Sequence, residues 1–278
     1  MRTRNLIGIF LLLCFLLAGC RTAENDGKEA PEETPALSAA AQPSEEPEQP
    51  EKTAVLNGAL LLGEYRGLTY AATDVEPSEA EIEAQLAALA ALYGAGTELT
   101  DELIAEHFPE YSTVTEYREA VRQALRQQKE EETLRDKRRQ LLARLIDSAV
   151  LQKDVSQEVA AYRGSLLDFY RERAAVAGET LADYCSRELA MDEAAFESYL
   201  TEAAETYIRG RYCLRGVAEL EGLAVSEETY ETMLPALAQE NGYEAPAEFA
   251  EDYSKDVIRD MMLCELAFQV VLETAAAE

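Results

Sequence analysis

The sequence predicts an all-α, elongated helical domain organised around one long helix with helical arms, and three observations support this. Apolar residues recur at helical spacing over most of the chain after about residue 75. Capping-box signals, Ser78 with Glu81 and Thr113 with Glu116, stand where two of these patterns begin. Strand signals are weak outside residues 59–72, and no internal repeat of about 20 to 50 residues is evident.

The first 20 residues have the features of a cleaved export signal. Two arginines precede the apolar segment 6–17, which is short for a membrane-spanning helix. The sequence LAGC at 17–20 resembles the bacterial lipobox, in which the signal is cut before the cysteine and the thiol receives diacylglycerol. We therefore expect a lipoprotein signal peptide at 1–19 and lipidation at Cys20, although an ordinary secretory signal with a chance cysteine is the alternative. Two or more acyl chains would hold the protein at the extracytoplasmic face of the cell membrane.

The charge of the chain is strongly negative, with 54 acidic and 25 basic residues. Loss of residues 1–19 would leave 23 basic residues against 54 acidic ones, a net charge of −31. We expect no nucleic-acid partner, because the phosphates would be repelled. Anionic headgroups would be repelled too, so the expected anchor is the lipid and not a basic patch.

Residues 20–56 are expected to form a disordered tether. Residues 21–56 hold nine acids, three bases, five of the nine prolines and no aromatic residue. Such a segment cannot bury enough apolar surface to offset its ordering entropy, and its like charges extend it. The folded domain is therefore predicted to comprise residues 57–278.

The predicted helices follow one another along this domain. The first begins at Ser78 and ends near Tyr93. The longest, roughly 114–150, has amphipathic ends but a middle, 126–140, with almost no apolar residue except Leu134. At about 55 Å it would exceed the width of a compact domain, so we expect its two ends to pack separately. Further helices are predicted at 156–177, 180–189, 192–222, 226–240 and 253–274, with Ser156, Thr180 and Asp192 as N-caps and Gly178 as a stop.

The sequence offers little support for catalysis. His107 is the only histidine, and no nucleophile motif such as GxSxG accompanies it, so a surface histidine is expected. No P-loop or GxGxxG motif occurs. Cys185, Cys213 and Cys264 lack metal-ligand spacing; one disulfide is an alternative, but each lies in an apolar helical pattern, and buried thiols are expected. We therefore predict no catalytic residue, no metal and no cofactor.

Several stretches, in their order along the chain, resemble the trigger factor family. LGEYRGLTY (62–70) is similar to the segment with which trigger factors leave their ribosome-docking domain, and VEPSEAEIEAQLAAL follows it as in that family. The later matching stretches are 99–125, 138–157, 222–242 and 257–275. The resemblance covers roughly residues 60 to 275 and implies the helical substrate-binding domain of that family. It also implies that LGEYRGLTY is a strand-like lead-in that docks on the helical body; a bare turn is the alternative.

The departures from the family are informative. Trigger factors carry an FKBP-type prolyl isomerase domain between the segments that correspond to 75–92 and 99–125, where about six residues stand here. The ribosome-docking domain and its basic loop have no counterpart, so no ribosome is expected as partner. The resemblance therefore implies the substrate-binding domain alone, exported and lipid-anchored. Periplasmic chaperones with parvulin domains have a similar helical module.

The expected function is that of an ATP-independent extracytoplasmic chaperone that holds unfolded, nascent or newly exported polypeptides. Aromatic and methionine side chains on helical arms bind many sequences weakly, and a high net charge keeps copies apart. The candidate polypeptide contacts are Phe169, Tyr170, Tyr184, Tyr199, Tyr207, Met233 and Met262. For each of them, ordinary core packing between helices is the alternative.

Two other functions remain open at this point. The arms could clasp one dedicated envelope partner as an interaction or scaffold module. Residual prolyl isomerase activity is the third hypothesis, and the missing domain argues against it.

Overall fold

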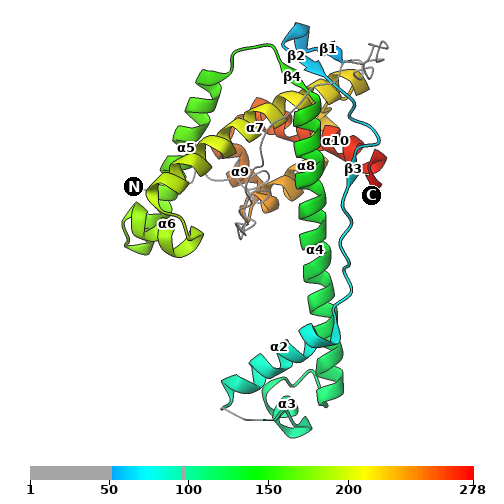
Figure 1. The fold of residues 1–278 in the computed structure, drawn as a ribbon, viewed down its shortest axis with the longest axis vertical. Coiled ribbons are helices and arrows are strands. Elements are labelled where there is room, and N and C mark those ends of the chain that lie inside the picture. Colours follow the sequence, from blue (N-terminus) through cyan, green and yellow to red (C-terminus); the bar gives the residue numbers. More distant parts are fainter. Residues whose placement is uncertain (1–51, 95–97) are drawn as a thin grey trace, which may run out of the picture. The chain divides into compact units, whose positions relative to one another are not determined.

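The computed structural model describes residues 52–94 and 98–278. In these ranges the chain forms nine α-helices, α2 to α10, and five strands of two or three residues (Figure 1), which confirms the predicted all-α fold class. Within the same ranges, no helix combines the length and the apolar character that a membrane crossing requires. The predicted signal peptide, Cys20 and the tether up to residue 51 lie outside the described residues.

The described chain divides into two compact units. Unit 1 comprises the residues up to Leu68 together with Leu142–Thr274, and unit 2 comprises Thr69–Leu141 with Ala275–Glu278. Helix α4 (Val114–Ser148) is continuous through the division, with 35 residues and a length of about 52 Å. Its two ends therefore belong to different units, as the amphipathic ends and charged middle of its sequence predict.

A small antiparallel sheet forms one part of unit 1. Strand β2 (Leu60–Leu62) lies between β1 (Thr53–Val55) and β4 (Val150–Leu151), and a 3-10 turn, η2 (Leu56–Gly58), joins β1 to β2. Residues 53–55, which the sequence assigns to the tether, are thus part of the fold. Alternation places Val55, Leu60 and Leu62 on the buried face of the sheet.

Helix α7 (Glu193–Glu221) packs under this sheet and is the central element of unit 1. A Cβ on Gly216 would lie 2.8 Å from Val55 Cγ2 and 3.0 Å from Leu60 Cδ2, so the glycine is what lets the strands approach. Gly210 plays a similar part toward α4, because a Cβ there would lie 3.1 Å from Leu142 Cδ1.

The remaining helices of unit 1 form two arms. The first arm consists of α5 (Ser156–Ala177), α6 (Leu181–Leu189) and the first half of α7. The second arm consists of α8 (Glu227–Glu240), α9 (Pro246–Asp252) and α10 (Lys255–Thr274). Asp260 of α10 accepts ion pairs from Arg211 and Arg215 of α7, at 2.6 and 2.8 Å, and so ties the second arm to the central helix.

Most of the predicted helix ends are confirmed. The side chains of Thr180 and Asp192 accept hydrogen bonds from the backbone N–H groups of Asp183 and Ala195, and Gly178 is a left-handed C-cap with φ 72°. Ser156 is not a cap. The N-cap of α5 is Val155, and the Ser156 N–H donates to Asp154 Oδ1 instead.

Unit 2 contains α2 (Glu79–Leu92), α3 (Asp101–His107) and the first 28 residues of α4. The predicted capping box is present at Ser78 and Glu81. At α4, Thr113 Oγ1 accepts from the Glu116 N–H, while the Glu116 carboxylate reaches the Ser112 N–H rather than that of Thr113. Strand β3 (Thr69–Tyr70) pairs in parallel with β5 (Ala276–Ala277).

The segment LGEYRGLTY is a docked lead-in, as the resemblance implies. Leu62 ends β2, and a Cβ on Gly63 would lie 2.5 Å from the Ser148 carbonyl oxygen. The Tyr65 hydroxyl donates to Glu221 Oε1 at 2.5 Å, and the Arg66 guanidinium binds both oxygens of the same carboxylate. These donors hold the pKa of Glu221 below its usual range, with the Tyr65 hydrogen bond as the larger cause.

Candidate functional site

The first arm is built on a buried stripe of α5. Leu166, Tyr170 and Ala174 follow one another at four-residue intervals and are all buried. They belong to one apolar cluster with Cys185 of α6 and with residues of α7; the α7 members are Phe196, Leu200, Ala203 and Ala204. The two alanines let the α5 and α7 backbones approach closely, so the arm is a tightly packed helical hairpin.

Beside the buried stripe, α5 carries a second row of apolar residues that reaches solvent. Tyr162, Phe169 and Val176 recur at seven-residue intervals, which places them on one face of the helix. Tyr162 and Phe169 are half-buried, and Val176 is 85% exposed. We call these three residues the α5 stripe.

Two residues of the α5 stripe make contacts through their rings, one with another aromatic ring and one with a cation. The ring of Tyr162 stacks on that of Tyr207 of α7, with centroids 3.8 Å apart and an interplanar angle of 4°. The Arg173 guanidinium lies 4.9 Å from the centroid of the Phe169 ring. One face of each ring is therefore covered by its partner. The uncovered parts of the rings and the Val176 side chain form a surface that suits weak contact with apolar side chains.

The first-arm residues predicted from the sequence divide into two groups. Phe169, Tyr184, Tyr199 and Tyr207 are half-buried and present part of their rings to solvent. Tyr170 is only 9% exposed, and its hydroxyl is 3.1 Å from that of Tyr199. Tyr170 is thus a core residue that positions Tyr199, and its prediction as a direct contact is corrected.

The second arm encloses another aromatic cluster. Tyr230, Leu237, Phe249, Tyr253, Ile258 and Met262 are buried in it. Met233 is half-buried at its edge, as is Met261. Met262 is completely buried and cannot contact a polypeptide, which corrects the prediction made for it. It follows Ile258 at the four-residue interval of the inward face of α10, whereas Met261 is one position, about 100°, away from that face.

The residues that carry chemistry elsewhere have ordinary roles here. His107 is exposed, and its ring lies 4.5 Å from that of Tyr93. Cys185 and Cys213 are buried and Cys264 is half-buried, all as free thiols. Burial raises the pKa of the Cys213 thiol and of the Cys264 thiol to about 12, so neither is a ready nucleophile at neutral pH. Among residues 52–94 and 98–278, no group of histidine, cysteine and carboxylate side chains could hold a metal ion.

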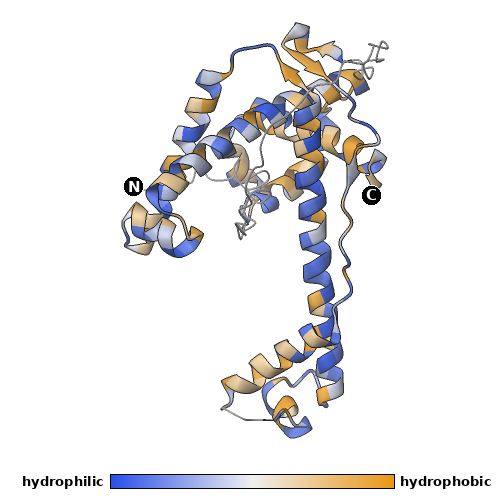
Figure 2. Cartoon of the chain, viewed as in Figure 1, coloured by the Kyte–Doolittle hydropathy of each residue, from blue (hydrophilic) through white to orange (hydrophobic). Residues whose placement is uncertain are grey.

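Sequence reasoning did not single out several exposed apolar side chains as candidate contacts. Val176 and Leu220 in unit 1, and Leu92 and Tyr93 in unit 2, leave large apolar areas in solvent. Its position in the helical repeat could have identified Val176. It lies two positions beyond Ala174, the last residue of the buried stripe, and so points away from the buried face. Figure 2 shows how hydrophobic and hydrophilic residues are distributed along the helices of the described chain.

The fold and these surfaces define a class of protein: a helical domain whose two arms present half-buried aromatic and methionine side chains. The sequence model of the family described as bacterial trigger factor protein (TF) C-terminus matches residues 113–273, more than half of the chain. The chain belongs to this family. Residues 93–100 alone connect α2 to α3, where the resemblance places the isomerase domain of trigger factors.

Other comparisons add little. No curated protein matches the chain. One similar solved structure concerns promiscuous substrate recognition in folding and assembly activities of the trigger factor chaperone; it has 18% sequence identity and a TM-score of 0.34. The match covers 64% of this chain and 43% of that chain, so this protein spans less than half the length of that relative.

Proposed function

We propose that this protein is an ATP-independent chaperone that holds unfolded or newly exported polypeptides at the extracytoplasmic face of the cell membrane. The observation that carries the proposal is the α5 stripe, an aromatic and aliphatic surface on a rigid arm in a chain of the trigger factor C-terminus family. The half-buried Met233 and Met261 of the second arm supply a further adaptable surface. Clients would bind weakly and exchange fast, because many shallow contacts replace any deep, specific pocket.

Aggregation of a chemically unfolded model protein tests the proposal. The chain from residue 20 onward, with Cys20→Ser to prevent oxidation, should suppress light scattering at equimolar amounts. Val176→Asp combined with Phe169→Ser should weaken that suppression several-fold, since a charge on the stripe opposes apolar contact. Ala175→Asp is the matched control, because Ala175 is exposed on α5 but lies outside the stripe. Absence of suppression at several-fold excess would reject a general holdase and favour an interaction module for one dedicated envelope partner.

The lipid anchor is part of the proposal and rests on the LAGC sequence at 17–20. A radiolabelled or clickable fatty acid should label the full chain in a bacterial host, and Cys20→Ala should abolish that labelling. Release of the unmodified protein into the soluble fraction should accompany the loss. Labelling that persists in Cys20→Ala would exclude this cysteine as the acceptor.

We propose no prolyl isomerase step for this chain. The support is the short connection between α2 and α3, residues 93–100, which cannot contain a domain. A proline-isomerisation assay on a tetrapeptide substrate should give the uncatalysed rate at any protein concentration.

A further inference from the structure

Unit 2 exposes an apolar surface that is separate from the arms and has no part in the function proposed for them. Leu92, the last residue of α2, is 81% exposed, and the adjacent Tyr93 is 38% exposed. In a small unit whose own core is limited, two such side chains at one helix end form a notable apolar area.

An aromatic row continues from this point along α3 and the start of α4. The Tyr93 and His107 rings have centroids 4.5 Å apart, and Phe108 follows His107 in the chain. The Phe108 and Tyr117 rings are 4.7 Å apart, and Tyr111 meets Tyr117 edge to face at 5.4 Å. We call Leu92, Tyr93, His107, Phe108, Tyr111 and Tyr117 the α3 tip.

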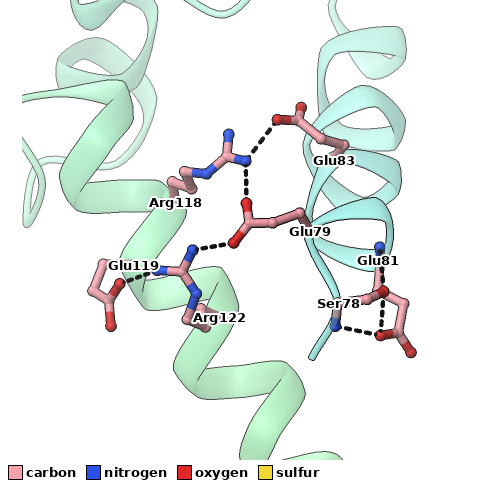
Figure 3. Close-up of polar contacts among 7 residues, drawn as sticks. All are labelled: Ser78, Glu79, Glu81, Glu83, Arg118, Glu119 and Arg122. Carbon is pink, nitrogen blue, oxygen red and sulfur yellow. Dashed lines mark hydrogen bonds and ion pairs between the residues drawn. The ribbon is translucent and has the colours of Figure 1, made fainter. Parts of the chain in front are cut away.

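The chain that leads up to and includes the α3 tip is acidic. Residues 67–117 contain no lysine or arginine and eleven acidic residues. Some of these carboxylates are neutralised by α4. Arg118 pairs with Glu79 and Glu83 at 2.8 and 2.6 Å, and Arg122 pairs with Glu79 at 2.7 Å (Figure 3).

The carboxylates of α3 and the turn after it are different. Glu102, Glu106 and Glu110 are exposed, and none of them forms an ion pair with another residue of the described chain. Glu102 and Glu106 are four residues apart on one face of α3, an arrangement that repels and weakens a short helix. By contrast, Asp101 and Glu116 accept backbone hydrogen bonds from Val114 and Ser112 and so have a structural use.

We propose that the α3 tip is a docking surface for a cationic amphipathic segment of a partner protein, in which lysine or arginine stands beside leucine or an aromatic residue. The apolar side chains of the segment would cover Leu92 and Tyr93, and its cations would relieve the repulsion between Glu102 and Glu106. Lysine and arginine also bind the faces of aromatic rings, which the tip supplies. A second copy of this chain is a poor occupant, because the net charge of −29 opposes self-association. This surface does not depend on the holdase activity proposed for the arms.

Fluorescence anisotropy with three labelled peptides of equal length tests this proposal on the chain from residue 20 onward with Cys20→Ser. The first peptide alternates lysine with leucine at helical spacing, the second replaces lysine by glutamate, and the third replaces leucine by serine. The lysine–leucine peptide should bind about tenfold or more tightly than either of the others, and its affinity should fall as salt is raised. Equal affinity for the glutamate peptide would overturn the proposal.

Paired variants locate the site. Glu102→Gln with Glu106→Gln should weaken binding of the lysine–leucine peptide about tenfold and flatten its salt dependence. Glu64→Gln with Asp147→Asn removes the same charge from two exposed sites of unit 1 and should leave the affinity unchanged. Leu92→Ser with Tyr93→Ser should weaken binding without removing a charge, which guards against an effect of α3 unfolding. If binding is lost instead on Val176→Asp with Phe169→Ser, the segment binds the first arm and the α3 tip is excluded.

Discussion

At the scale of single residues, two glycines show how the absence of a Cβ determines packing in unit 1. A Cβ on Gly63 would lie 2.5 Å from the Ser148 carbonyl oxygen and 2.9 Å from Ser148 Cβ. Backbone atoms cannot move as the end of a side chain can, so the lead-in and the end of α4 would have to separate. Gly164, inside α5, meets no atom within 4 Å and has no such constraint.

Gly63→Ala is therefore expected to lower the free energy of unfolding by about 1–3 kcal/mol through overpacking. Gly164→Ala should raise it by about 0.5–1 kcal/mol, because alanine loses less backbone entropy in a helix interior. Urea denaturation followed by circular dichroism measures both changes. Equal effects of the two substitutions would show that helix propensity, and not the contact with Ser148, decides the outcome.

The limits of sequence reasoning are clearest at single positions. The residue types of the arms, aromatic and methionine, are predicted correctly as members of helical apolar patterns. Which of these residues face the core is not predicted correctly. The buried Met262 and the half-buried Met261 are only one position apart. The inward direction of α10 depends on α7 and α8, which are far away in the sequence, so periodicity alone could not select between the two.

At the scale of elements, the sequence predicts the features that depend on nearby residues, such as helix caps, better than those that depend on distant segments, such as short strands. Thr180 and Asp192 are confirmed as caps because a cap needs only a backbone N–H three residues away. Strands β1 and β4 were not predicted, because each has two or three residues and pairs with β2, whose own position depends on α7. The prediction of Ser156 as a cap was wrong because Ser156 is the first residue inside α5, and Asp154 Oδ1 accepts from the Ser156 N–H.

The ion pairs that attach α2 to α4 should depend on pH. Glu79 binds Arg118 and Arg122, and Glu81 binds Lys129 at 2.8 Å. The Lys129 hydrogen bond, followed by that of the Ser78 N–H, lowers the pKa of Glu81 from 4.5 to about 2. The pKa of Glu79 is also lowered, chiefly by its hydrogen bond from Arg118.

A carboxylate whose pKa is lower in the folded state stabilises that state above its unfolded pKa and ceases to do so as the pH falls through the folded value. The attachment of α2 should thus be constant above pH 5 and weaken between about pH 4.5 and 2. Hydrogen exchange should show a several-fold loss of protection in α2 peptides over that interval, after correction for intrinsic rates. Glu79→Gln should already reduce protection at pH 7, whereas Glu130→Gln, which affects a pair with Arg126 on α4 itself, should not. Unchanged α2 protection down to pH 2 would assign the attachment to Ile82, Leu86 and Ala90 alone.

At the scale of the whole molecule, the chain distributes its apolar residues unevenly. Nearly all buried hydrophobic side chains in the described residues belong to unit 1, with β2, α7 and both arms among their sources. The buried apolar residues of unit 2 are few: Ile82, Leu86, Ala90, Ile104 and Leu141. Partly exposed ion pairs, aromatic contacts and the pairing of β3 with β5 add to its cohesion, and such ion pairs typically contribute about 0–1 kcal/mol each.

Unit 2 should consequently unfold before unit 1. Helix α4 passes through both units, but its middle consists of the exposed Leu134 and mainly charged or polar residues. It therefore buries little surface that could couple the unfolding of unit 2 to that of unit 1. In a urea titration followed by hydrogen exchange and mass spectrometry, peptides from α2 and α3 should lose protection at a concentration lower by about 1 M than peptides from α7 and α10. Raising the salt concentration should widen this interval, because it screens the ion pairs of unit 2 and leaves the apolar core of unit 1 intact. A single transition, coincident for all four helices, would show instead that α4 couples the units into one cooperative structure.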